Sequence, residues 1–161
     1  MNHLAIKYGI RMFAGFAILF LFFHILGLSH HYELRMLNGA VHLGFLYLLI
    51  RDFRREQPES RDNYISAVAL GMNASVLAVV AFTFCMFLFL TFNEPFFQKL
   101  QAQSPLPEYF RPFTASLYIL MEGIAVSLIG SYIITRIVDS RVERRQEMKA
   151  KMSQSEAVER G

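Results

Sequence analysis

Four long apolar stretches dominate this chain and limit what it can fold into. They cover roughly Met12–Leu28, Leu34–Ile50, Ile65–Phe92 and Pro112–Ile134. Each stretch is long enough for a helix to cross the roughly 30 Å hydrocarbon core of a bilayer, and the third, at about 42 Å, must tilt, kink or protrude. Hydrophobic residues make up 54% of the chain, which is high for a domain that folds in water. We therefore predict an all-α fold, a bundle of four transmembrane helices.

Lysine and arginine are distributed unevenly over the connections between these stretches. Of the 16, only Arg35, Lys99 and Arg111 follow the first or the third stretch; the others precede the first stretch, follow the second or follow the fourth. Basic residues near the ends of a span resist translocation. The split predicts that both termini lie on the cytoplasmic side. We expect a membrane domain over residues 1–138, and a charged cytoplasmic tail over residues 139–161 that is helical and then disordered.

The connection between the third and fourth stretches has the pattern of a short amphipathic helix. Asn93 can cap a helix, and Pro95 suits a first turn. Phe96 and Leu100 would then share one face of that helix. We predict a short helix over Glu94–Gln103 that lies on the outer surface of the membrane.

The charge pattern and the motifs exclude several classes of function. A net charge of +3 and a basic isoelectric point could indicate nucleic-acid binding. The basic residues flank apolar stretches, however, where they meet anionic lipid headgroups, so we expect no nucleic-acid partner. The sequence contains no Gly-x-Ser-x-Gly, no phosphate-binding loop and no His-Glu-x-x-His. These absences predict a protein that is not an enzyme.

Two histidines within the apolar stretches raise the question of a haem. His24 and His42 lie on neighbouring predicted helices, and such a pair can ligate one iron. Their distances from the outer ends of the two stretches differ, which offsets them by about 6 Å along the membrane normal. We therefore expect no cofactor and no metal.

Polar side chains near the middle of the apolar stretches are the best candidates for a functional site. A carboxylate there, such as that of Glu122, costs at least about 2.5 kcal/mol unless a partner, a water or protonation offsets it. His42 lies at a similar depth, Asn73 is within reach, and Asn38 should also face protein. The four could form a proton relay or a polar pocket for a small ligand. They could equally form a structural hydrogen-bond cluster that orients the helices.

Small residues spaced four apart mark predicted helix-packing faces. They are Gly71 and Ser75 on the third stretch, Gly123 and Ser127 on the fourth, and Ala40 and Gly44 on the second. Such spacing places small side chains on one side of a helix, where another backbone can approach closely.

Five short motifs follow one another in an order that resembles a known family. They are Lys7-Tyr8-Gly9, Leu34-Arg35-Met36-Leu37-Asn38, Ile50-Arg51-Asp52-Phe53-Arg54, the segment 64–71, and Asn93-Glu94-Pro95. Over roughly residues 5–138 the chain resembles a bacterial family of membrane proteins with a domain of unknown function, numbered 4199. Glu94 separates an Asn and a Pro that are adjacent in the family. The resemblance implies a four-helix protein of the bacterial inner membrane, and it implies no activity, cofactor or catalytic residue.

Two functions remain open at this point. The first is a small accessory or scaffold protein of the bilayer that packs against other membrane subunits or against itself. The small-residue faces, the bulky phenylalanine surface and the lack of reaction motifs favour it. The alternative is a small channel, carrier or proton-conducting protein that uses Glu122 and His42.

Overall fold

The computed structural model describes residues 2–28, 36–56, 63–104 and 107–159, and within them the regular structure is helical. The elements are α1 (Asn2–Ile25), α2 (Met36–Glu56), α3 (Tyr64–Phe92), α4 (Glu94–Ala102), the 3-10 turn η3 (Pro107–Tyr109) and α5 (Pro112–Glu159). The predicted start of the second span at Leu34 and the last two residues of the predicted tail lie outside the described residues.

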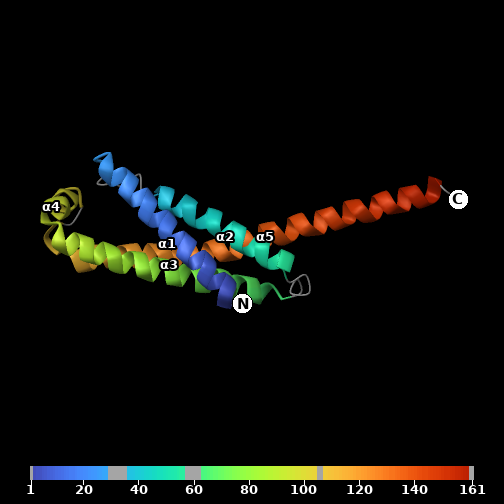
Figure 1. The fold of residues 1–161 in the computed structure, drawn as a ribbon, viewed down its shortest axis with the longest axis horizontal. Helices are drawn as coiled ribbons and strands as arrows, with labels where there is room; N and C mark the ends of the chain where they lie inside the picture. Colours follow the sequence, from blue (N-terminus) through green and yellow to red (C-terminus); the bar gives the residue numbers. More distant parts are fainter. Residues whose placement is uncertain (1, 29–35, 57–62, 105–106, 160–161) are drawn as a thin grey trace.

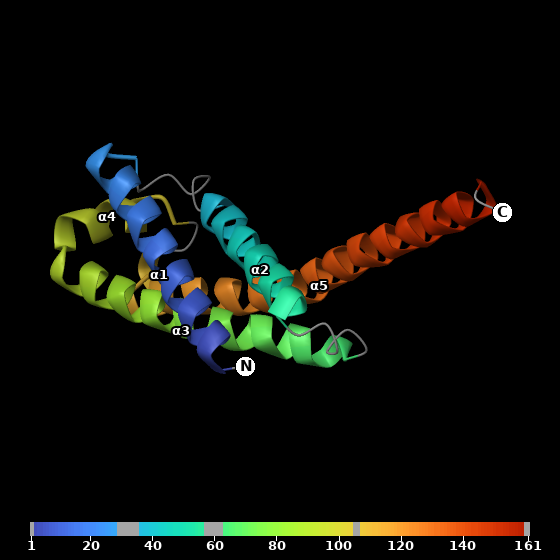
Figure 2. The same cartoon turned by 45° about the vertical axis from the view of Figure 1, so that its right-hand side comes forward.

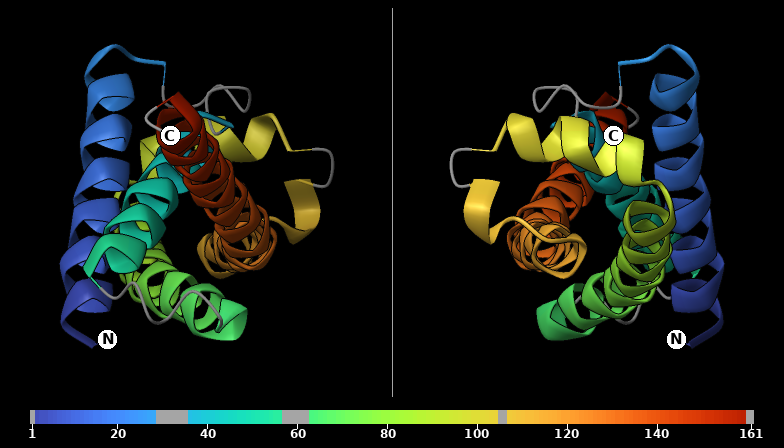
Figure 3. Two further views of the ribbon diagram at one scale, coloured as in Figure 1. Left: turned by 90° about the vertical axis from the view of Figure 1, so that its right-hand side faces the viewer. Right: turned by 90° about the vertical axis from the view of Figure 1, so that its left-hand side faces the viewer.

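The four long helices lie side by side and alternate in direction (Figure 1). α1 and α3 run one way, and α2 and α5 run the other. The short helix α4 lies at one end of the bundle, and the C-terminal part of α5 projects beyond the other end (Figure 2). Views along the bundle show α4 lying across that end (Figure 3). The N-terminus and the projecting part of α5 are therefore both remote from α4.

Three of these helices are long and apolar enough to cross a membrane. By length and composition they are His3–Ile25, Tyr64–Phe92 and Pro112–Arg141. The remaining long helix, α2, does not belong to this group, because it carries polar residues along its length and a charged end. The prediction of an all-α fold is confirmed, with three candidate spans among the described residues. A fourth crossing by α2 stays a prediction.

The helix ends follow from local capping. α1 closes where Gly27 adopts a left-handed φ of 70°, and the Leu28 N–H donates to the Phe23 carbonyl at 2.9 Å. Leu28, the predicted end of the first span, therefore lies just outside the helix. Asn93 ends α3 and also caps α4, where its side chain accepts a hydrogen bond from the Phe96 N–H. α4 is the short helix that the sequence predicts.

α5 is longer than the apolar pattern indicates. It continues from Pro112 through the predicted domain boundary at residue 138 as far as Glu159. The segment after Ile134 is rich in Glu, Arg, Lys, Met and Ala, which all favour helix. The helix therefore extends through most of the charged segment 139–161, including the part for which the sequence predicts disorder.

α3 forms the centre of the bundle, where it packs against both α5 and α1. The helices approach closely where glycines lie. A Cβ atom at Gly71 would come within 2.6 Å of Ser131 Oγ, and one at Gly123 within 2.5 Å of Val79 Cγ1. Larger side chains at either position would push α3 and α5 apart. These close contacts between α3 and α5 hold in place the helices that line the candidate site.

Candidate functional site

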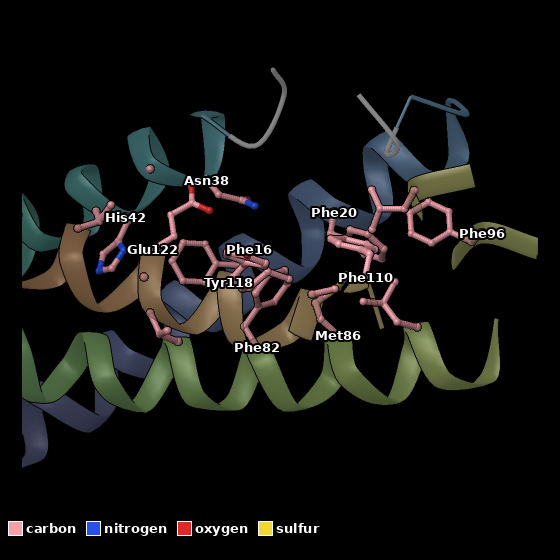
Figure 4. Close-up of a pocket in the computed structure, with 18 residues that line it drawn as sticks. Phe16, Phe20, Asn38, His42, Phe82, Met86, Phe96, Phe110, Tyr118 and Glu122 are labelled. Carbon is pink, nitrogen blue, oxygen red and sulfur yellow. The ribbon is translucent and has the colours of Figure 1, made fainter. Parts of the chain in front are cut away.

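The half of the bundle next to α4 contains a pocket with a volume of about 110 Å³ (Figure 4). Its polar end is formed by Asn38 and His42 of α2 and by Glu122 of α5, and its apolar end lies near Phe96 and Phe110. Between these ends the wall consists mainly of Phe16, Phe20, Val79, Phe82, Met86, Leu90, Tyr118 and Ile119. Every helix of the bundle thus contributes to this one pocket.

His42 is held rigidly in the wall of the pocket. It is only 2% exposed, and a hydrogen bond of 2.8 Å joins its Nε2 atom to Ser75 Oγ of α3. The Ser75 hydroxyl also lies 4.0 Å from Met12 Sδ of α1. The ring of Phe16 packs edge-on against the imidazole, with centroids 5.5 Å apart. The contacts of His42 and Ser75 therefore link α1, α2 and α3 at the polar end of the pocket.

Glu122 and Asn38 face each other across the gap between α5 and α2. Figure 4 shows the Glu122 side chain pointing toward Asn38. Glu122 is exposed in the isolated chain, whereas the Asn38 Oδ1 atom is buried and has no hydrogen-bond partner among the described residues. A buried acceptor without a donor is unfavourable, because it loses its bond to water. The polar end of the pocket thus presents an unused acceptor beside a carboxyl group.

Asn73 does not join the other three polar residues. It is exposed, and it is not among the residues that line the pocket. The reason is helical geometry: Asn73 lies two positions before the buried Ser75, a rotation of about 200° around the α3 axis. The structure therefore brings Asn38, His42 and Glu122 together and leaves Asn73 on another face of α3.

α4 closes the apolar end of the pocket. Phe96 is 9% exposed, and its ring lies 5.3 Å from that of Phe89, 5.6 Å from that of His24 and 6.3 Å from that of Phe20. The sequence predicts Phe96 on the apolar face of this helix, but it does not reveal what that face contacts. The contacts show that α4 packs on α1 and α3 of its own chain.

The predicted packing residues fall into two groups. Gly71, Ser75 and Ser127 are buried, and a side chain at Gly123 would collide with α3. Ser127 Oγ donates to the Gly123 carbonyl of its own helix at 2.6 Å, so its hydroxyl needs no partner across the seam. On α2, by contrast, Ala40 and Gly44 are exposed, and a Cβ at Gly44 would have no described atom within 4 Å.

A second polar layer at the opposite end of the bundle was missed by sequence reasoning. Arg54 of α2 is 2% exposed and pairs with Asp139 of α5, and the Tyr8 hydroxyl of α1 donates to Asp52. This bond is the main cause that holds the pKa of the Asp52 carboxyl below its ordinary value. Helical spacing was the sequence signal that could have revealed this layer. Arg54 follows the buried Ile50 by four residues and therefore lies on the same face of α2.

The fold is all-helical among the described residues, and its apolar helices suggest a membrane protein. Its three apolar helices are compatible with a bilayer, and its pocket lies between them. In comparisons with family models, with curated proteins and with solved structures, nothing matches this chain. The resemblance to family 4199 therefore stays a prediction.

Proposed function

We propose that the protein is a non-enzymatic accessory or scaffold subunit of the bacterial inner membrane, which associates with a second copy through one face of α2. This α2 face consists of Met36, Ala40, Leu43 and Gly44, all of which are exposed. Met36, the first of these residues, is 80% exposed. Among the described residues this α2 face is exposed, although the Leu43 side chain lies close to Gly130 of α5, and the opposite side of the same helix packs into the bundle.

The pair of small residues on the exposed side of α2, Ala40 and Gly44, is the observation that carries this proposal. Among the described helices, α2 is the long helix outside the group of candidate spans, and its polar side chains Asn38 and His42 face the pocket. Its exposed face has two small residues spaced four apart. Such a pair lets a second helix approach closely enough for extensive van der Waals contact. A symmetric dimer would place α2 against α2 and shield this helix from lipid.

Disulfide cross-linking in native membranes tests this association. The exposed Cys85 is first replaced by Ser, and a single cysteine is then placed at Ala40 or Gly44. We expect covalent dimers from both variants on mild oxidation, because a disulfide needs Cα atoms within about 7 Å of each other. Val80→Cys, on an exposed position of α3, is the matched control and should stay monomeric. Equal cross-linking at all three positions, or none at Ala40 and Gly44, would overturn the proposal.

The proposed orientation places both chain termini in the cytoplasm and α4 outside, with α2 as a fourth crossing. The alternating directions of the four long helices support it (Figure 1). Reporter enzymes that are active only outside the cytoplasm, fused at Gln101 and at the C-terminus, test it. We expect activity at Gln101 alone, and activity of the C-terminal fusion would contradict the orientation.

A carrier or proton-conducting protein is the second candidate. The joint presence of Glu122 and His42 in the wall of one pocket favours it. Such a protein, reconstituted into liposomes, would carry a proton or solute flux that Glu122→Gln abolishes. Absence of flux for the wild-type protein under a pH gradient and under a membrane potential would exclude proton conduction.

A further inference from the structure

Basic side chains surround the hydrogen bond from Tyr8 to Asp52, at the end of the bundle remote from α4 (Figure 1). Lys7 and Arg11 of α1 lie about one helical turn apart, on either side of Tyr8 in the sequence. The Lys7 Nζ atom lies 6.0 Å from the centroid of the Tyr8 ring, and the Arg11 Cζ atom lies 5.3 Å from it. Both side chains are exposed, and neither has an ion pair among the described residues. The α1 side of this bond therefore presents two positive charges.

α2 repeats the arrangement on the other side of the bond. Arg51 and Arg55 lie about one turn apart, on either side of Asp52 in the sequence. The Arg51 Nη2 atom lies 3.1 Å from Asp52 Oδ1, and the Arg51 side chain is still 43% exposed. The bond from Tyr8, then Arg51 and then the charge of Arg55 lower the pKa of the Asp52 carboxyl. The exposed Arg55 thus lies near this carboxyl as well.

The basic cluster formed by these side chains carries more positive charge than its surroundings neutralise. It consists of Lys7, Arg11, Arg51 and Arg55. Asp52 and the exposed Glu56 at the end of α2 set two carboxylates against these four cations. Like charges one turn apart on a helix repel each other, and the basic cluster contains two such pairs. A phosphate between the pairs would offset this repulsion, and guanidinium groups bind phosphate oxygens especially well.

The surface of α1 beyond Arg11 indicates which phosphate compound fits. Ile18 and Phe22 follow Arg11 by seven and eleven positions, so they lie on the same face of α1. They are 68% and 56% exposed. α1 is a candidate span, so this face would meet the bilayer. An apolar face in line with the basic cluster suits the acyl chain of a phospholipid, whereas a soluble phosphate compound would leave it uncovered.

We propose that the basic cluster binds the headgroup of an anionic phospholipid, with its phosphate between α1 and α2 and one acyl chain along Ile18 and Phe22. Basic pockets between membrane helices on the cytoplasmic side are suited to such headgroups. The proposal requires that the chain lies in a bilayer, but it does not require a second copy. The basic cluster lies at the opposite end of α2 from the α2 face, so a failure to cross-link at Ala40 or Gly44 would leave it standing.

Thermal unfolding in a neutral detergent, with lipid added in steps, tests this proposal. A ligand that binds the folded state raises the unfolding temperature according to its concentration relative to its dissociation constant. We expect dioleoylphosphatidylglycerol to act at concentrations at least about ten-fold lower than dioleoylphosphatidylcholine, which has the same chains and no net charge. Glycerol 3-phosphate, which has the phosphate without the chains, should have no effect at these concentrations. Equal effects of the two lipids, or an equal effect of glycerol 3-phosphate, would overturn the proposal.

Two double variants with the same loss of charge separate the basic cluster from general attraction to anionic lipid. One combines Lys7→Gln with Arg11→Gln, and the other combines Arg136→Gln with Arg144→Gln, which are exposed on α5. We expect the phosphatidylglycerol concentration that gives half of the stabilisation to rise at least about ten-fold in the first and less than about three-fold in the second. Arg55→Gln changes the α2 side alone and should raise it about five-fold. Equal weakening in the two double variants, or no weakening in Arg55→Gln, would contradict a site between α1 and α2.

Discussion

Arg54 at the end of α2 donates two parallel hydrogen bonds to Asp139 of α5, from Nε to Oδ1 and from Nη2 to Oδ2, each 2.9 Å long. The guanidinium group is almost completely buried, and the carboxylate is largely shielded. Such a two-pronged pair fixes both distance and orientation. It therefore sets how α5 leaves the bundle on the side from which its C-terminal part projects (Figure 2).

Removing one partner of this pair should destabilise the protein strongly. Arg54→Ala or Asp139→Ala leaves a shielded charge without its partner, which typically costs about 3–5 kcal/mol. Replacing both residues should cost less than the sum of the two single changes. Unfolding in detergent measures the losses, with Arg55→Ala, an exposed neighbour, as the control within about 0.5 kcal/mol. Additive losses in the double variant would show that the pair contributes nothing as a pair.

The seam between α3 and α5 should not tolerate a larger residue at Gly123. Gly123→Leu forces its side chain against Val79, and we expect a loss of about 1–3 kcal/mol or more from overpacking. Gly39→Ala is the control, because that position is open, lies outside the α2 face, and alanine favours helix by up to about 1 kcal/mol over glycine. Both are compared by thermal unfolding in detergent. A Gly123→Leu protein as stable as the wild type would contradict the close contact.

The hydrogen bond between His42 and Ser75 should contribute to stability. Ser75→Ala leaves the buried imidazole Nε2 without its partner, at a cost of about 1–3 kcal/mol. Ser127→Ala, also buried, removes only a hydroxyl that bonds within its own helix, and should cost less than about 1 kcal/mol. The two variants are compared in the same detergent. Equal losses would mean that the bond across the helices has no special weight.

The bond from Tyr8 to Asp52 predicts a specific dependence on pH. Because the pKa of Asp52 is lower in the folded state than in the unfolded one, its carboxylate stabilises the fold above the unfolded value of about 3.9. That stabilisation is lost as the pH falls through the folded pKa. We expect Tyr8→Phe to cost about 1 kcal/mol at pH 6, and the difference from wild type to shrink below pH of about 4. Unfolding temperatures measured across this range check it, and a difference that does not change with pH would count against the bond.

The sequence predicts the helices far better than their contacts. The third span agrees with α3 to within one residue at its start, since a long and mostly apolar segment flanked by Asn63 and Asn93 leaves little choice. α1 begins at Asn2 rather than near Met12, because Leu4 and Tyr8 continue a buried face that mean hydropathy does not detect. The buried face of a helix can be assigned only when the positions of the neighbouring helices are known.

The polar residues show the same division between depth and direction. Their depth in the apolar stretches follows from position in the sequence, and this predicts a meeting of Glu122 with His42. Direction around the axis depends on how each helix is rotated in the bundle, which places Asn38 in the pocket and Asn73 outside it. α3 would have to be rotated by about 200° to bring Asn73 to the direction that Ser75 takes.

By itself, the sequence determined that this chain forms long apolar helices with basic residues concentrated at one side, because hydrophobic length and charge are local properties that act before any packing. Only the tertiary structure decided that α4 covers its own bundle, that Arg54 pairs with Asp139, and that Asn38, His42 and Glu122 share one pocket. These contacts join residues far apart in the chain. They depend on close approaches between helices, such as those at Gly71 and Gly123, that no stretch of sequence encodes alone.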